Sequence, residues 1–272
     1  MTYISELVSS RELLVNLTMR EVKGKYRRTV FGQLWSMINP LATMLVYTIV
    51  FSVIFRARIV TGDPSGITIY PLWLMSGLLP WMFFTRVVNQ GMASITSNGS
   101  LIKKVYFPRI SLPLSAVGAT GFTWLIEMGV LSVALLIFGS RLLPWLPLVI
   151  GMMVLLALFA AGMAMLLAII NVHFRDMQHL MAIVLQMWMY LTPIIYPISL
   201  VEEASAKHGA WILTVYRLNP MERFVEVFRN FLYDNRWPDP TDFVFCFLAA
   251  AVVFALGFLV FSRNDKNLAE LL

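Results

Sequence analysis

The feature that most constrains this fold is a long apolar stretch near the N-terminus. Residues 34–55 form a run of 22 residues without Asp, Glu, Lys or Arg. At about 1.5 Å of rise per helical residue, such a run crosses the hydrocarbon core of a bilayer, which is about 30 Å thick. Further apolar runs follow at 67–84 with a continuation to 95, 110–138, 145–170, 180–201 and 243–261. The sequence therefore predicts an all-α integral membrane protein with six transmembrane helices.

The composition supports the same class. The 272 residues are 59% hydrophobic and 13% charged, whereas a soluble domain is about half apolar and about a quarter charged. A soluble enzyme, a disordered chain and a secreted disulfide scaffold are therefore disfavoured. The formal charge of +6 reads as membrane topology and not as nucleic-acid binding, because the basic residues lie between the apolar runs.

The basic residues also orient the expected bundle. Twelve Lys and Arg lie in the segments that are cytoplasmic if the N-terminus is, against three in the short outer loops. The positive-inside rule therefore predicts a multi-pass membrane protein with both termini in the cytoplasm. No cleavable signal peptide is expected in residues 1–33. The predicted divisions are an interface helix at 1–33, a transmembrane domain at 34–262 and a cytoplasmic tail at 263–272.

An amphipathic helix is expected before the first span. An apolar stripe recurs at helical spacing over residues 8–30, in Val8, Val15, Met19, Val22, Tyr26 and Val30. Cations flank this stripe at Arg20, Lys23, Arg27 and Arg28. This pattern predicts a helix on the cytoplasmic membrane surface, with its cations near lipid phosphates. A simple basic leader is the alternative. Leu13 and Leu17 lie on the opposite side, where contact with protein is expected.

The segment 202–242 is long for a loop without a function. Asn219 and Pro220 read as a helix start, and Glu222 is placed to close a capping box. An apolar face and a polar face follow. We expect a pair of short re-entrant helices in the outer leaflet. A surface helix at the outer interface is the alternative. The candidate residues of this segment are Trp211, Asn219, Pro220, Phe224, Phe228 and Arg229.

Motifs for enzyme chemistry are missing from the sequence. It contains no P-loop, no H-E-x-x-H and no paired cysteines, and its three histidines are scattered. We therefore expect neither catalytic residues nor a metal site, and any energy must enter through another protein. Glu127 is the ionisable residue deep inside a predicted span. It is either a proton carrier or a paired structural group.

Aromatic residues recur on three predicted spans. Flat aromatic faces with a hydrogen-bond donor suit stacking against sugar rings, so the stripes indicate a substrate channel. Packing against lipid and interfacial belts are the alternatives. The expected channel residues are Tyr47, Phe51, Phe55, Tyr70, Trp73, Trp81, Phe84, Trp188 and Tyr196.

The inner segment 97–109 reads SNGSLIKKVYFPR. This segment fits a basic cytoplasmic loop and equally a docking site for a cytoplasmic partner. The residues alone do not distinguish these two interpretations.

Five motifs carry a resemblance over nearly the whole chain. Residues 20–28 with 34–40, then LIKKVYFPR at 101–109, FRD at 174–176, TPIIYP at 192–197 and LNPM at 218–221 with Arg229 occur in this order. In this order they resemble the ABC transporter permeases that export polysaccharides such as O-antigen, capsule and teichoic acid. The overall residue pattern is most similar to that of actinobacterial members, including mycobacterial galactan exporters.

The resemblance implies a homodimer of twelve spans in the bacterial inner membrane, docked on two copies of a separate ATPase that binds ATP and Mg²⁺. It also implies that the candidate residues of the segment 202–242 form an outer gate. The cargo would be a glycan on a polyprenyl pyrophosphate. ATPase coupling would fall to Leu101, Lys103, Lys104, Tyr106, Phe107, Pro108, Arg109, Arg175 and Asp176. The interface helix would attract the pyrophosphate through Arg20, Lys23, Lys25, Arg27 and Arg28.

Three rivals remain open at this point. One keeps the architecture and changes the cargo to a drug or small lipid. A closed apolar pocket would favour it, whereas aromatics along a continuous lumen would favour a glycan. Another is a proton-driven secondary transporter that uses Glu127. The last is a membrane glycosyltransferase, which lacks the catalytic acids and nucleotide-sugar site it would need.

Overall fold

The computed structural model describes residues 10–25, 31–50, 61–174, 176–265 and 268. Every regular element in these ranges is helical, which confirms the all-α prediction there. The longer elements are α2 (Arg11–Lys25), α3 (Trp35–Tyr47), α4 (Tyr70–Ser97), α6 (Ser111–Ile137), α7 (Leu146–His173), α8 (Met177–Tyr190), α9 (Ile198–His208), α11 (Pro220–Arg229) and α12 (Pro240–Asn264). Shorter ones are η1 (Gly32–Leu34), α5 (Gly99–Ile102), η3 (Leu143–Trp145), α10 (Trp211–Arg217) and η4 (Asn230–Asp234).

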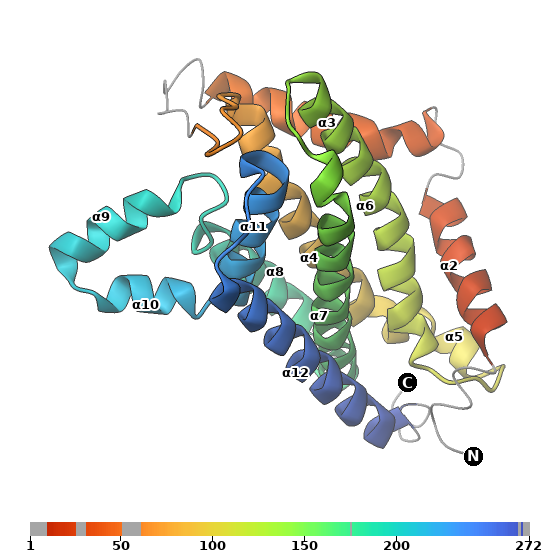
Figure 1. Ribbon diagram of the computed structural model, residues 1–272. Coiled ribbons are helices and arrows are strands. Elements are labelled where there is room, and N and C mark those ends of the chain that lie inside the picture. The colour runs from red at the N-terminus through yellow and green to blue at the C-terminus, as the bar shows by residue number, and fades with distance from the viewer. Residues whose placement is uncertain (1–9, 26–30, 51–60, 175, 266–267, 269–272) are drawn as a thin grey trace.

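Four helices in the described part of the chain are long and apolar enough to cross a membrane, namely α4, α6, α7 and α12. They correspond to the second, third, fourth and sixth predicted spans, within a few residues at each end. The end of the bundle that holds the start of α2 and the end of α12 is here called the terminal end, and the other is the loop end (Figure 1). The apolar helices support an integral membrane protein.

The first and fifth predicted spans differ from expectation. α3 is 13 residues long and crosses the loop end of the bundle (Figure 1), while Phe51 and Phe55 lie outside the described residues. α8 is 14 residues long, about 21 Å at ~1.5 Å per residue, and ends at Tyr190. Residues 191–197 are turns. Pro193 explains the break, because proline lacks the amide hydrogen and disfavours helix at the residue before it.

The core lies around α4 and α7, and α12 crosses α7 in close contact. A Cβ added at Gly257 would lie 2.4 Å from the carbonyl oxygen of Gly162, and one added at Gly162 would lie 2.4 Å from that of Val253. Both glycines therefore let the two backbones meet directly. Small residues of this kind let two helices approach closely, and here the contact lies within one chain.

The interface helix α2 packs along α6 (Figure 1). Leu17 and Val22 are buried, and a Cβ added at Gly118 of α6 would lie 3.0 Å from Thr18. Val15 and Met19 of the predicted stripe stay exposed. The expectation that Leu17 contacts protein is confirmed, so residues 11–25 are part of the bundle. Val8, Tyr26 and Val30 lie outside the described residues.

Residues 233–235 tie the loops at the loop end together. The Tyr233 hydroxyl donates a hydrogen bond to the backbone carbonyl of Ile67 at 2.7 Å. The Ser65 amide donates one to the backbone carbonyl of Asp234 at 3.0 Å. The Asn235 side chain accepts hydrogen bonds at 2.9 Å from Ser140 and from the Arg141 amide. Asn235 adopts a left-handed backbone with φ of 60°, which asparagine tolerates better than most residues.

Candidate functional site

Two loops at the terminal end expose aromatic side chains. Tyr106, after α5, is 88% exposed, and Phe174, between α7 and α8, is 64% exposed. Lys103, Lys104 and Asp176 are also exposed in these loops. Large aromatic groups that face outward beside cations suit a protein partner, because interfaces are enriched in exposed aromatic anchors.

The remaining predicted coupling residues support these loops from beneath. Phe107 and Pro108 are buried, and Phe107 packs in a cluster with Leu17 and Phe261. Arg109 contacts Asp265 at the end of α12, both through the carboxylate at 3.8 Å and through the backbone carbonyl. Leu101 and Arg109 are half-buried. The sequence grouped all of these as contact residues, but burial removes Phe107 and Pro108 from the surface. Arg175 lies outside the described residues.

The cations expected at a pyrophosphate divide in the same way. Arg20 donates to the side chain of Asn98, at the end of α4, at 2.8 Å, so it binds protein. Lys23 is exposed. Arg27, Arg28 and the side chain of Lys25 lie outside the described part of the chain. A cavity of about 430 Å³ adjoins α2, and the ionisable group in its lining is Glu21. Burial raises the pKa of Glu21, and a carboxylate there does not favour a pyrophosphate.

The outer segment holds a buried cation. Arg229, at the end of α11, is 4% exposed, although the sequence placed it on a polar face. Its guanidinium donates to the carbonyls of Pro193 and Ile194, both at 2.6 Å. The turn after α8 thus accepts hydrogen bonds from both terminal nitrogens of the cation, while its Nε has no hydrogen-bond partner among the described residues. α11 is accordingly a core helix and not a surface helix, with Met221, Phe224, Val225 and Phe228 fully buried.

Asn219 joins α11 to α8. Its side chain accepts from the Met221 amide at 3.0 Å and from the Trp188 indole at 2.7 Å, and it donates to Thr192 at 3.0 Å. The predicted N-cap is confirmed, with Pro220 at the first turn. The prediction that Glu222 closes a capping box is wrong, because the Asn219 amide donates instead to the backbone carbonyl of Tyr216 at 3.0 Å. The Glu222 carboxylate pairs with Arg223 at 3.5 Å. The predicted pair of outer helices is a set of three, α9, α10 and α11, and Trp211 of α10 is 65% exposed.

The predicted channel aromatics of α4 lie inside the subunit. Tyr70, Trp73, Trp81 and Phe84 are buried. The Phe84 ring centre is 5.4 Å from that of Trp188 and 5.5 Å from that of Phe159, and Trp81 is 6.0 Å from Trp188. These rings pack in the core of the chain, so the prediction that the aromatic residues of α4 line a channel does not hold. Tyr47, Trp188 and Tyr196 are half-buried.

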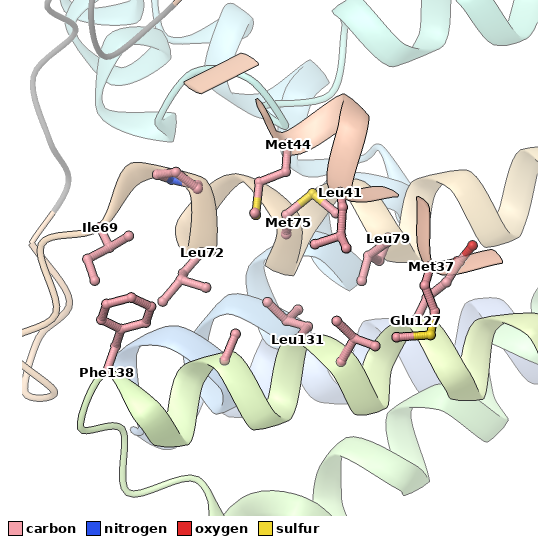
Figure 2. A pocket seen from close by; sticks show the side chains of 13 residues that line it. Met37, Leu41, Met44, Ile69, Leu72, Met75, Leu79, Glu127, Leu131 and Phe138 are labelled. Atoms are coloured by element: carbon pink, nitrogen blue, oxygen red, sulfur yellow. The ribbon is translucent and has the colours of Figure 1, made fainter. Parts of the chain in front are cut away.

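Glu127 has a partner that the sequence analysis missed. Arg86 of α4 lies 2.6 Å from its Oε1, so the structural reading of this buried carboxylate is supported. An apolar pocket of about 210 Å³ begins beside the pair. Figure 2 shows Met37, Leu41 and Met44 of α3 facing Leu72, Met75 and Leu79 of α4 across this pocket, with Leu131 and Phe138 of α6 along one wall. Methionine side chains adapt to varied apolar ligands.

The described residues contain no group of three His, Cys, Asp or Glu side chains that fits a metal, and Cys246 is buried. The sequence analysis did not single out Arg86, Asn235 or the exposed Trp237. Arg86 interrupted an apolar run, which was the available signal for it.

The sequence matches the family described as ABC-2 type transporter over residues 12–233. The chain belongs to this family. Among the similar proteins is the O-antigen export system permease protein RfbA of Myxococcus xanthus, 31% identical over 98% of both chains. RfbA of Klebsiella pneumoniae is 29% identical over 96% of this chain and 95% of its own. Polysialic acid transport protein KpsM of Escherichia coli is 23% identical over 79% of this chain and 78% of its own.

Membership assigns this ABC-2 type transporter chain to the membrane-transport subunits. The prediction that it is a transport subunit and not itself an enzyme is confirmed by that family. The resemblance found in the motifs is confirmed for the polysaccharide-export group, since the similar permeases span nearly the full chain. A specific likeness to galactan exporters stays a prediction.

Proposed function

We propose that this chain is the permease subunit of an ATP-driven exporter that moves a lipid-linked polysaccharide out of the cytoplasm. The observation that carries the proposal is the 31% identity over 98% of both chains to an O-antigen export permease. Other similar proteins are named for O-antigen and polysialic acid transport. The cargo could equally be a galactan, as the resemblance to actinobacterial members suggests.

A separate ATPase supplies the energy and binds ATP with Mg²⁺. We infer that two copies dock at the terminal end of a permease homodimer, on the surface formed by Lys103, Lys104, Tyr106 and Phe174. Tyr106 and Phe174 are the most exposed aromatic groups of these loops, and burial by a partner would remove their apolar surface from water. The buried Phe107 and the Arg109–Asp265 contact link this surface to α2 and α12.

The assembly places the terminal end in the cytoplasm, as the basic residues favour. α3 and α8 are shorter than the first and fifth predicted spans. Both carry strongly exposed apolar residues, such as Leu45 and Val46 on α3 and Ile183 and Met187 on α8. A second subunit or lipid would cover these faces. We therefore place the dimer contact at α3 and α8, and α9 to α11 at the outer gate.

The glycan path then lies between the two subunits. The aromatic rings of α4 are packed in the core. The rings that face the sugar are therefore those of the half-buried Tyr47, Trp188 and Tyr196. The Tyr196 hydroxyl is 3.2 Å from that of Tyr216, so tyrosines from two elements meet at this side. Weak stacking on such rings suits a polymer that must keep moving.

A second candidate cargo is a small apolar molecule. The pocket of about 210 Å³ between α3, α4 and α6 is the observation that favours it. That volume is below the roughly 300 Å³ at which small-molecule sites begin, and it fits part of a hydrocarbon chain better than a drug. The lipid carrier of a glycan has such a chain, so the pocket is compatible with the first proposal.

Co-purification tests the partner. The tagged chain is extracted in mild detergent, and an ATPase subunit is expected to elute with it at equal stoichiometry. Tyr106→Ala with Phe174→Ala is expected to abolish this association. Phe138→Ala is the control, because Phe138 is also an exposed aromatic and lies at the loop end. A chain that purifies alone and moves substrate in liposomes without ATP would refute an ABC exporter.

Depletion tests the cargo. Cells that lose this chain are expected to accumulate a lipid-linked glycan on the cytoplasmic side of the membrane, and re-expression should clear it. Unchanged surface glycan together with new sensitivity to small apolar compounds would instead favour the second candidate.

A further inference from the structure

A polar pocket lies at the start of α12, away from the sites described above. Its volume is about 270 Å³, close to the roughly 300 Å³ lower bound of small-molecule sites. It therefore suits one ring-sized unit. The lining residues are Glu226 of α11, Asn230 of η4, Arg236, Trp237 and Asp239 of the following loop, and Asp242 of α12.

Trp237 offers an open aromatic surface in this pocket. Its side chain is 71% exposed. The Trp145 ring lies 5.3 Å away at 71°, and the Phe231 ring 6.3 Å away at 80°. Neighbours at such steep angles hold the indole without stacking flat on it. A large apolar group left this open is unfavourable in water unless something covers it.

The loop that carries Trp237 is held in one conformation. Pro238 and Pro240 follow at alternate positions and restrict the backbone around Asp239. Asp239 caps α12 by accepting from the Thr241 amide at 2.9 Å. On the other side, the Arg236 amide donates to the Asn230 carbonyl at 2.9 Å. Preorganisation of this kind lowers the entropic cost of binding.

Donors and acceptors surround the indole. Arg236 donates through Nε to the Asn230 side chain at 2.6 Å, which fixes the guanidinium. Its Nη2 is 3.9 Å from Oε1 of Glu226, too far for a direct hydrogen bond. A hydroxyl between these two groups would donate to the carboxylate and accept from the guanidinium. Asp239 adds acceptors on the other side of the pocket.

We propose that this pocket binds one saccharide unit of the exported glycan, with the sugar ring on the Trp237 indole and its hydroxyls on Glu226, Arg236 and Asp239. The inference rests on the proposed function and names a contact for the glycan outside the path between subunits. A lipid headgroup is the rival occupant of an exposed indole. The pocket disfavours it, because Glu226 and Asp239 outnumber Arg236, while Asp242 pairs with Arg223, and anionic headgroups are repelled by carboxylates.

Saturation-transfer NMR on the permease–ATPase complex in nanodiscs tests the proposal, with short galactose and N-acetylglucosamine oligomers as probes. The native complex should transfer signal to at least one probe. Trp237→Ala should weaken that binding about tenfold, as for a central aromatic contact. Trp237→Phe should retain most of it, and Glu226→Gln should weaken it a few-fold. Phe247→Ala is the matched control, since Phe247 of α12 is also an exposed aromatic and does not line the pocket, and it should bind like the native chain.

Four outcomes overturn the proposal. Equal binding by Trp237→Ala would move the sugar contact elsewhere. Quenching of the Trp237 emission by brominated lipids, measured as the difference between native and Trp237→Phe, would place the indole among headgroups. A native complex that exports glycan in cells but binds no oligomer would reject this pocket and leave the proposed function standing. A complex that neither binds oligomers nor exports glycan would reject both.

Discussion

The guanidinium of Arg229 lies 3.8 Å from the centre of the Trp73 ring. The same cation donates to the carbonyls of Pro193 and Ile194. One buried side chain therefore joins α11, α4 and the turn after α8. In a desolvated setting a cation over an indole is worth more than at a surface. We conclude that Arg229 fixes the position of α11 relative to α4 and to the turn after α8.

Arg229→Lys is expected to loosen this junction. An ammonium is a point donor and does not replace the planar fork that reaches two carbonyls while it stacks on a ring. The loss should be about 2 kcal/mol of stability, as for hydrogen bonds to a charged group. Thermal unfolding of the purified chain in detergent measures it. Arg217→Lys is the control, because Arg217 pairs with Glu202 at 3.9 Å on an exposed helix, and an equal loss in both variants would contradict the role of Arg229.

Gly257→Ala is expected to disrupt the crossing of α7 and α12. The added Cβ would meet the Gly162 backbone, at 2.4 Å from its oxygen, and backbone does not move aside as a flexible side chain does. The cost should be about 3 kcal/mol, at the upper end for overpacking. Gly151→Ala serves as the control, because nothing lies within 4 Å of its added Cβ and alanine favours helix. Size-exclusion after heating compares them, and equal survival would disprove the tight crossing.

The Arg86–Glu127 pair predicts a stability effect and not a transport defect. Glu127→Gln removes one partner of a pair that lies at 2.6 Å, and breaking a buried pair costs about 3–5 kcal/mol. The double variant Arg86→Gln with Glu127→Gln should recover part of that loss. Export per folded molecule should stay unchanged in both. A stable Glu127→Gln protein that no longer transports would instead revive the proton-coupled reading.

Asp234 predicts a dependence of stability on pH. Burial raises the pKa of this carboxyl to about 6 from an ordinary 3.8, partly offset by Arg236. Between these values the folded chain holds a proton that the unfolded chain releases, so this group lowers stability as pH rises from about 4 to about 6. Thermal melts across this range should show a smaller decline in Asp234→Asn than in the native chain. Parallel curves would exclude Asp234 as the source.

The helices of the bundle were well predicted by periodicity and caps. The bounds of α6, α7 and α12 agree with apolar runs within a few residues, and Asn219 caps α11 as its sequence suggests. These are local properties, since hydropathy and capping depend on residues a few positions apart. The break after Tyr190 was also visible in Pro193 and Pro197, but the apolar run was extended across them.

The roles of single residues were predicted less well. Phe107 follows the exposed Tyr106 directly in the sequence, yet its own side chain is buried. Arg229 lies on the polar side of an amphipathic helix, yet it is buried and donates hydrogen bonds to carbonyls of another segment. Both depend on partners distant in the chain, such as Ile194 and Phe261, and residue spacing holds no information about those partners.

By itself, the sequence determined the class of this protein, since apolar runs without charges need lipid. It also determined where the long helices begin and end. Only the tertiary structure decided which aromatics pack inside the subunit, which cations are paired and that Trp237 stands open beside a polar pocket. The reason is physical: a helix forms from local interactions, whereas burial and pairing depend on which surfaces meet when the helices pack.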